Sequence, residues 1–213
     1  MEHWLDWVAP PRCEVCASVL GAGGGVFCAG CRPSLYLSSR TLEGVPLLSA
    51  FNYKQEPVRD ALHRFKFQDR PEMGRLLSRE LAFALSSSTL HRLGAVNWLP
   101  VPSDPVRLIE RRYNQAMLLA RGLAVQSGGR VYPTLLERQT ASHAQTHLTK
   151  RDRQTNVCIN VSSRFAHGQQ VASRRVVLVD DVCTTGATLR GCIEGLRASG
   201  MSVQAAVVFA DNP

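Results

Sequence analysis

The sequence predicts an α/β fold, a parallel sheet with helices on both faces, joined to a small N-terminal knuckle of four cysteines. Strand signals and helical signals alternate over residues 95–213, a pattern that favours a parallel sheet with crossover helices. Arg175–Val179 is, after its first residue, a continuous apolar run, as in a strand buried on both faces, and Val203–Phe209 predicts another buried strand. Four of the seven cysteines lie in residues 1–40. We therefore expect the knuckle, with a short N-terminal helix, at residues 1–40 and the α/β domain at residues 41–213.

The first elements of the α/β domain are predicted from their boundaries. Residues 41–94 are typical of a strand or hairpin followed by a helix. Ala95–Val101 is a short apolar run closed by prolines, which predicts a strand leading into a loop. Pro105–Gln126 repeats apolar residues at helical spacing until Gly128–Gly129, which predicts one helix.

The remaining elements complete the alternation. Val131–Leu136 predicts a further strand. Arg138–Asn156 is polar and rich in Gln, Thr, Arg and His, which predicts a long exposed loop. Thr188–Ser199 predicts a helix that Gly200 ends, between the two buried strands.

The charge of the chain favours phosphate-rich partners. The net charge is +8, and only Lys54, Lys66 and Lys150 of the 25 basic residues are lysines. The others are arginines, whose planar fork matches phosphate in nucleotides or nucleic acid. A genome that favours arginine codons would give the same composition.

Membrane and export signals are not visible in the sequence. No window approaches the roughly 18 apolar residues of a membrane span, and the N-terminus lacks a basic stretch followed by an apolar run. We therefore expect a cytoplasmic protein.

Two Cys-x-x-Cys pairs define the knuckle. Cys13 and Cys16 are followed, after eleven residues, by Cys28 and Cys31. Four thiolates at this spacing are typical of a tetrahedral Zn²⁺ site. Two disulfides, which the cytosol disfavours, and a redox pair are the alternatives. Because four thiolates leave the metal no open position, we expect a structural zinc ion.

A strand-to-helix turn carries the second motif. The apolar run from Val176 ends in Asp180 and Asp181, and a turn rich in Thr and Gly then opens a helix. Amides at a helix N-terminus favour an anion, and Gly186 lets the backbone approach a phosphate closely. The pattern predicts a site for a ribose 5-phosphate group, in which the two acids accept hydrogen bonds from the ribose diol and hydroxyl donors come from Thr184, Thr185 and Thr188.

Two alternative interpretations account for less of this motif. A strand–turn–helix whose threonine only caps the helix accounts for one threonine, and not for two acids, three threonines and a glycine within residues 176–188. The acidic strand of a P-loop ATPase is excluded because no G-x-x-x-x-G-K-[ST] occurs in the chain.

A basic segment precedes the middle of the chain. Arg64, Lys66 and Arg70 interleave with Phe65 and Phe67. Basic residues mixed with aromatic residues suit single-stranded nucleic acid, because charge meets the phosphates and rings stack on the bases. A solvated helix face with two core phenylalanines is the alternative.

These motifs together resemble known families. Val176–Leu189 resembles the phosphoribosyl pyrophosphate (PRPP) motif of type I phosphoribosyltransferases. The whole chain resembles the ComF/GntX-type competence proteins, which join a four-cysteine zinc knuckle to a type I phosphoribosyltransferase-like domain. Further matching stretches are Leu62–Arg70, Pro100–Pro102 with Arg111–Ala116, and the sparse set Arg138–Thr140, Gln145, Leu148, Arg151 and Asn156. The chain departs from many family members at Arg112, where they have glycine before an aromatic residue.

The resemblance implies roles for particular residues. Asp180 and Asp181 would hold the ribose hydroxyls of PRPP. The turn Val101–Asp104 would lie near the pyrophosphate, with Mg²⁺ bridging ligand oxygens, and Arg112 and Asn114 would face the same pocket. The 5′-phosphate would be bound by Thr184, Thr185, Gly186, Ala187 and Thr188.

Three functions follow from the resemblance and the motifs. The first is a competence-type DNA-uptake protein that handles single-stranded DNA in natural transformation, in the cytoplasm or peripheral to the inner membrane, with the DNA-translocation machinery as partner. The second is an active phosphoribosyltransferase of nucleotide or base metabolism, in which positioning and charge stabilisation would assist pyrophosphate loss. The third is a PRPP-sensing regulator without catalysis. Because no hood for a nucleobase is recognisable, the knuckle and the basic segment favour the first.

Overall fold

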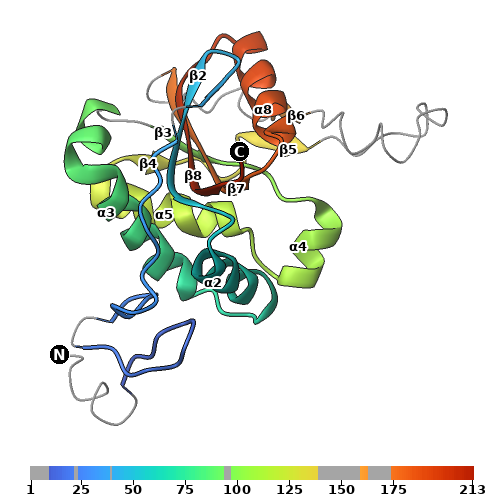
Figure 1. The fold of residues 1–213 in the computed structure, drawn as a ribbon. Helices are drawn as coiled ribbons and strands as arrows, with labels where there is room; N and C mark the ends of the chain where they lie inside the picture. The colour runs from blue at the N-terminus through green and yellow to red at the C-terminus, as the bar shows by residue number, and fades with distance from the viewer. Residues whose placement is uncertain (1–9, 22–23, 39, 94–96, 139–158, 163–173) are drawn as a thin grey trace.

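The main sheet has six strands in the order β1-β2-β8-β7-β3-β4 (Figure 1). The computed structural model describes residues 10–21, 24–38, 40–93, 97–138, 159–162 and 174–213. β1 pairs antiparallel with β2, and every other neighbouring pair of this sheet is parallel. The strands are β1 Thr41–Leu42, β2 Val45–Asn52, β3 Asn97–Pro100, β4 Arg130–Val131, β7 Arg175–Cys183 and β8 Ser202–Asp211.

The centre of the sheet is buried on both faces. Along β7, Val177 and Val179 belong to one hydrophobic cluster, whereas Val176 and Leu178 belong to the other. Alternation between two apolar clusters requires an uninterrupted apolar run, since successive side chains point to opposite faces of a sheet. This is the physical reason why a continuous apolar run predicts a central parallel strand.

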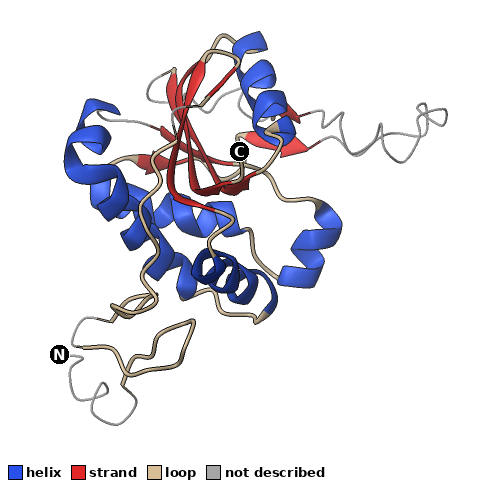
Figure 2. Ribbon diagram, in the orientation of Figure 1, coloured by secondary structure: helices blue, strands red, loops and turns tan. Residues whose placement is uncertain are grey.

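Helices cover both faces (Figure 2). On one face lie α2 (Glu56–Phe67), α3 (Met73–Leu93) and α5 (Gln115–Ser127); on the other lies α8 (Ala187–Ala198). A small antiparallel pair, β5 (Leu136–Arg138) and β6 (Ile159–Val161), packs beside α8. The predicted fold class is therefore confirmed.

The predicted helix over Pro105–Gln126 is wrong as a single element. The structure has α4 (Pro105–Arg111) and α5, because Arg112 adopts a left-handed φ of 63° that ends α4. Asn114 then caps α5 by accepting a hydrogen bond from the amide of Met117. The predicted stop is confirmed, since Gly128 ends α5 with a φ of 75°.

The predicted strand over Val131–Leu136 is also wrong as one strand. Its ends belong to different sheets, β4 at its start and β5 at its end, with Pro133 between them. Proline cannot donate to a strand ladder, which is consistent with the break. The predicted loop over Arg138–Asn156 and the short N-terminal helix fall almost wholly on residues 139–158 and 1–9, outside the described residues.

The knuckle packs against the α/β domain. Val26 and Phe27 are buried in the cluster that contains Phe51. Arg32 donates two hydrogen bonds to Glu80 of α3, at 3.0 and 3.2 Å. The division at residue 40 stays a prediction. In the part of the chain that the structure describes, none of the helices combines the length and the apolar composition of a membrane span.

Candidate functional site

The turn after β7 needs its glycine. Gly186 has a left-handed φ of 78° and stands immediately before α8. A Cβ at this position would lie 2.9 Å from a methyl of Leu42 and 3.2 Å from the guanidinium of Arg190. Both the backbone conformation and the close neighbours therefore exclude a side chain.

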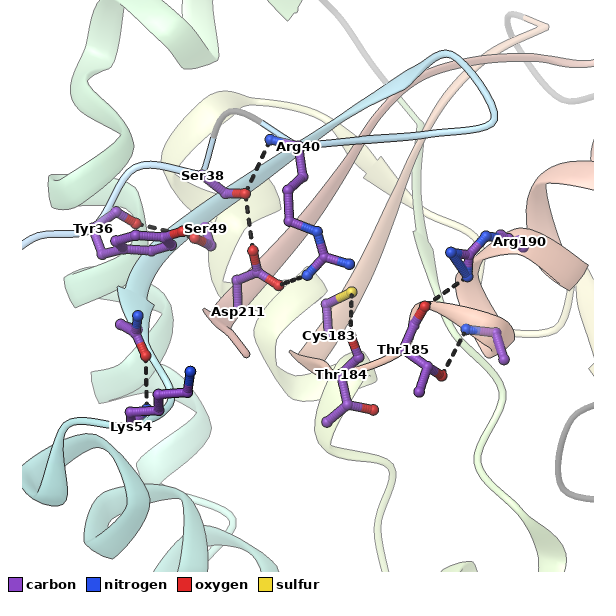
Figure 3. A network of polar contacts seen from close by, with 12 residues as sticks. Tyr36, Ser38, Arg40, Ser49, Lys54, Cys183, Thr184, Thr185, Arg190 and Asp211 are labelled. Carbon is purple, nitrogen blue, oxygen red and sulfur yellow. Dashed lines mark hydrogen bonds and ion pairs between the residues drawn. The ribbon is translucent and has the colours of Figure 1, made fainter. Parts of the chain in front are cut away.

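The turn leaves amide groups without protein partners. Thr184 and Thr185 are exposed, and the Thr185 hydroxyl accepts a hydrogen bond from the amide of Ala187 at 3.3 Å (Figure 3). Over the described part of the chain, no protein acceptor meets the amides of Thr184, Thr185, Gly186 and Thr188. Such amides at the start of a helix form an anion-binding arrangement.

Arg190, the fourth residue of α8, holds the backbone of the loop between β7 and α8. Its guanidinium donates to the carbonyl of Thr185 at 2.6 Å (Figure 3) and lies 3.6 Å from the carboxylate of Glu43, at the end of the β1–β2 hairpin. The carbonyl that would repel an anion is thereby held by a cation. Sequence reasoning missed Arg190, and its position four residues after Gly186 was the available signal.

The two acids lie at the end of β7 and are paired with amides and a lysine. Asp180 accepts from the amide of Asp181, and Asp181 accepts from the amide of Val182, both at 2.8 Å. The ammonium of Lys66 lies 2.6 Å from Asp181 Oδ2, with 19% and 14% of the two side chains exposed. That oxygen is buried and, apart from this ion pair, has no hydrogen-bond donor among the described residues.

Asp180 has an altered protonation equilibrium. Burial, followed by the charge of Asp181, raises its pKa to about 8, and the nearby Lys66 only partly offsets this. Two adjacent carboxyl groups in an apolar setting do not both ionise readily. The Asp180 carboxyl therefore keeps a proton near neutral pH in the free protein.

The turn after β3 lies beside the acid pair. Val101, buried at the start of that turn, donates its amide to the carbonyl of Val179 at 2.9 Å. Its own carbonyl accepts from the side chain of Asn114 at 3.0 Å. Two of the residues that the resemblance placed near a pyrophosphate thus contact each other at the carboxyl edge of the sheet, where open α/β sheets bind ligands.

A second ion pair occupies the same edge. Asp211, fully buried at the end of β8, accepts from Arg40 at 2.6 Å and from the Ser38 hydroxyl at 2.9 Å (Figure 3). The next residue, Asn212, donates its amide to the carbonyl of Cys183. This pair fixes the chain end beside the turn.

The predicted basic residues separate into different places. Lys66 faces Asp181, and Arg70 binds Glu14 at 2.6 Å and Glu72 at 2.8 Å. Arg64 is partly exposed.

Arg112 is 77% exposed and pairs with Asp69 at 3.1 Å, on the turn after α2. It therefore contacts neither acid of β7, although the resemblance implied a place in that pocket. Its left-handed φ occupies the position where family members have glycine, which adopts such angles at no steric cost.

The four cysteines of the knuckle converge. Their sulfur atoms all lie within 4.8 Å of one another, and Cys16 Sγ is 3.7 Å from Cys28 Sγ. Four sulfurs bound to a tetrahedral Zn²⁺ at about 2.3 Å would be about 3.8 Å apart. The amides of Val15 and Cys28 also point at Cys13 Sγ, at 3.4 Å each. The cluster therefore fits a metal ion.

The electrostatic environment of the four thiols favours a bound cation. Hydrogen bonding with Cys16 and then burial raise the pKa of Cys31, whereas hydrogen bonding with Ser18 lowers the pKa of Cys28. Four thiolates cannot coexist at this separation without a positive charge among them.

We expect Asp180→Asn to stabilise the protein increasingly as the pH rises. The native carboxyl keeps a proton that the unfolded chain loses near its usual pKa, so the wild type loses stability between about pH 4 and about pH 8. Asparagine resembles the protonated acid, and its advantage should grow by up to about 1.4 kcal/mol per pH unit. Urea unfolding across this window, without Mg²⁺, measures the difference, and parallel pH profiles for the two proteins would contradict it.

We expect Cys28→Ser to lose its metal. The wild type should carry about one zinc ion per chain, and the variant almost none, because a tetrahedral site loses one of four thiolates. Elemental analysis of purified protein measures this, with Cys192→Ala as the control, since Cys192 is a buried residue of α8 and is not part of the four-cysteine cluster. Zinc retained at the wild-type level by Cys28→Ser would refute the assignment.

Comparison with known proteins identifies a matching domain family and several relatives. Residues 133–213 match the family model of the phosphoribosyl transferase domain. The chain is 34% identical over 148 residues to competence protein F of Haemophilus influenzae. The aligned region covers 68% of this chain and 64% of that protein. It is 30% identical over 114 residues to an orotate phosphoribosyltransferase of Nocardioides sp., covering 52% of this chain and 60% of the relative. A match to the orotate phosphoribosyltransferase of Pyrobaculum islandicum is 44% identical over 51 residues, 24% of this chain and 26% of the relative.

The chain thus spans just under two thirds of the length of competence protein F. The match to the phosphoribosyl transferase domain includes β7, the turn and α8. The chain is thus a homologue of competence protein F, with a phosphoribosyltransferase-like α/β domain and a four-cysteine cluster near its N-terminus, as the resemblance to the ComF/GntX-type family predicts.

Proposed function

We propose that this chain is a competence-type DNA-uptake protein that binds PRPP, or another 5-phosphoribosyl ligand, at the turn after β7. The free amides of that turn carry the proposal, because they begin a helix directly after two acids at the carboxyl edge of a parallel sheet. The amides would hold the 5′-phosphate. Asp180 and Asp181 would accept from the ribose hydroxyls. A zinc ion in the four-cysteine cluster would be structural.

Mg²⁺ would accompany PRPP. The oxygens of Asp180 and Asp181 are the hard ligands that this ion prefers, together with the phosphate oxygens of the ligand. When bound, the ion would neutralise charge on the pyrophosphate. The chain's own residues orient the ligand: Val101 stands next to the end of β7, and Arg190 holds the turn.

Single-stranded DNA is the second part of the proposal, and a specific aromatic group favours it. Phe67, at the end of α2, is 61% exposed. The guanidinium of Arg111 lies 5.3 Å from its ring centre, and the ring of His63 lies at 4.9 Å. An exposed ring between cationic and aromatic neighbours suits a nucleobase stack. Phe65, by contrast, is fully buried.

The surface around Phe67 has other basic residues than those that the sequence predicted for DNA binding. Arg107 lies on α4 and Arg112 directly follows it, and both are exposed. The last residue of α4, Arg111, contacts the ring of Phe67. Arg107 and Arg112 would supply charge for a phosphate backbone. Arg112 pairs with Asp69 at the exposed surface, whereas Lys66 and Arg70 pair with carboxylates that are largely buried. DNA handling would take place in the cytoplasm, beside the DNA-translocation machinery.

Two alternatives share the same pocket. A catalytic phosphoribosyltransferase would release pyrophosphate from PRPP when a suitable nucleobase is added. A PRPP-sensing regulator would bind PRPP and release none. The relatives named orotate phosphoribosyltransferase favour testing orotate first.

We expect PRPP with Mg²⁺ to bind the wild type, and Asp181→Asn to weaken binding at least about tenfold, because charge-assisted hydrogen bonds to the ribose hydroxyls are lost. Isothermal titration calorimetry measures both proteins. Asp60→Asn, a change of the same kind on α2, is the control and should bind like the wild type. Equal affinity of the wild type and Asp181→Asn would refute the role of the acid pair.

We expect Phe67→Ala to weaken binding of a single-stranded oligonucleotide by roughly five- to a hundredfold, since stacking contributes about 1–3 kcal/mol per base. Fluorescence anisotropy at several salt concentrations measures the affinity. Phe83→Ala removes a ring that is 74% exposed on α3 and should have no effect. If both variants bind as the wild type does, Phe67 is not part of the DNA-binding surface.

A further inference from the structure

Lys66 is the one basic residue of the predicted nucleic-acid segment that the structure directs at the acid pair. It belongs to the last turn of α2, but its ammonium lies 2.6 Å from Asp181 Oδ2 at the end of β7. Only 19% of its side chain is exposed. A lysine placed there cannot bind a DNA phosphate on the outer surface while it keeps this ion pair.

The backbone beneath Lys66 is held independently of that ion pair. Phe65 is fully buried, and its carbonyl accepts a hydrogen bond from the Tyr113 hydroxyl. Arg70 fixes the following turn through Glu14 and Glu72. The end of α2 therefore has anchors of its own. The lysine side chain, with its flexible stem of four carbons, can exchange partners without movement of the helix.

A ligand hydroxyl that binds Asp181 Oδ2 has to replace this ion pair. The oxygen is buried, and apart from the ammonium of Lys66 it has no hydrogen-bond donor among the described residues. A ribose hydroxyl could donate such a hydrogen bond once the ammonium moves away. An ammonium released from Asp181 inside a partly buried pocket needs another anion, because a buried charge without a partner is costly.

We propose that Lys66 is an anion-binding residue of the sugar-phosphate pocket, held by Asp181 in the free protein and passed to the pyrophosphate of PRPP when the ribose hydroxyls occupy Asp181. This inference rests on the proposed function. On the ribose ring, C1 carries the pyrophosphate next to the C2 hydroxyl, whereas the 5-phosphate lies at the far end and meets the amides of Thr184–Thr188. Lys66, beside the acid that holds the diol, is therefore positioned for the pyrophosphate.

The proposal makes a prediction that separates two ligands. Lys66→Met should weaken PRPP binding with Mg²⁺ by about tenfold or more, the effect of losing a charge-assisted hydrogen bond. Binding of ribose 5-phosphate, which has no pyrophosphate, should change by less than about threefold by the same reasoning. Lys66→Arg keeps the charge and should recover part of the PRPP affinity.

Isothermal titration calorimetry with PRPP and with ribose 5-phosphate tests this on the full chain. Lys54→Met makes the same change at an exposed lysine before α2 and is the matched control. Thermal unfolding and zinc content establish that each variant is folded, and Lys66→Gln replaces Lys66→Met if the latter is not. Unchanged or tighter PRPP binding by the folded variant would overturn the inference, as would an equal loss for both ligands. If the wild type binds neither ligand, the proposed function fails and this inference fails with it.

Discussion

Two adjacent carboxyl groups at the end of a strand buried on both faces impose the main constraint on this structure. Moving such charges away from water without cations or donors costs several kcal/mol each. The protein meets this cost in three ways: backbone amides donate to both acids, Asp180 retains a proton near neutral pH, and Lys66 places its ammonium beside Asp181. A pair held in this way is stable in the free protein, and in the proposed site it would accept hydrogen bonds from ligand hydroxyls.

The same constraint connects parts of the chain that are distant in sequence. Lys66 reaches Asp181 only because α2 lies beside the end of β7, and the turn after α2 is joined to the knuckle by Arg70 and Glu14. Glu14 stands between the first two cysteines of the cluster. The end of α2 thus presents Lys66 inward and Phe67 outward. A sugar-phosphate pocket and a nucleic-acid surface would therefore lie on opposite sides of one helix turn.

Features written in local sequence could be predicted. The buried strands, the turn at Gly186 and the convergence of the four cysteines follow from apolar runs and fixed spacings, because neighbouring residues alone determine them. The break between α4 and α5 could not be predicted, since Arg112 takes a left-handed φ that is unusual for arginine. The place of Lys66 was missed because its charge was interpreted without tertiary structure. Its spacing of four from buried Leu62 was the signal that α2 turns this side chain inward.

The central claim is that the amides of the turn after β7 are free to bind a sugar phosphate. Backbone amide NMR during titration with ribose 5-phosphate tests it most directly, because each amide reports its own hydrogen bonding. The account predicts that the largest downfield shifts fall on Thr184, Thr185, Gly186 and Thr188, and that they saturate together. Unmoved resonances for these residues, with shifts elsewhere in the chain or none, would contradict it.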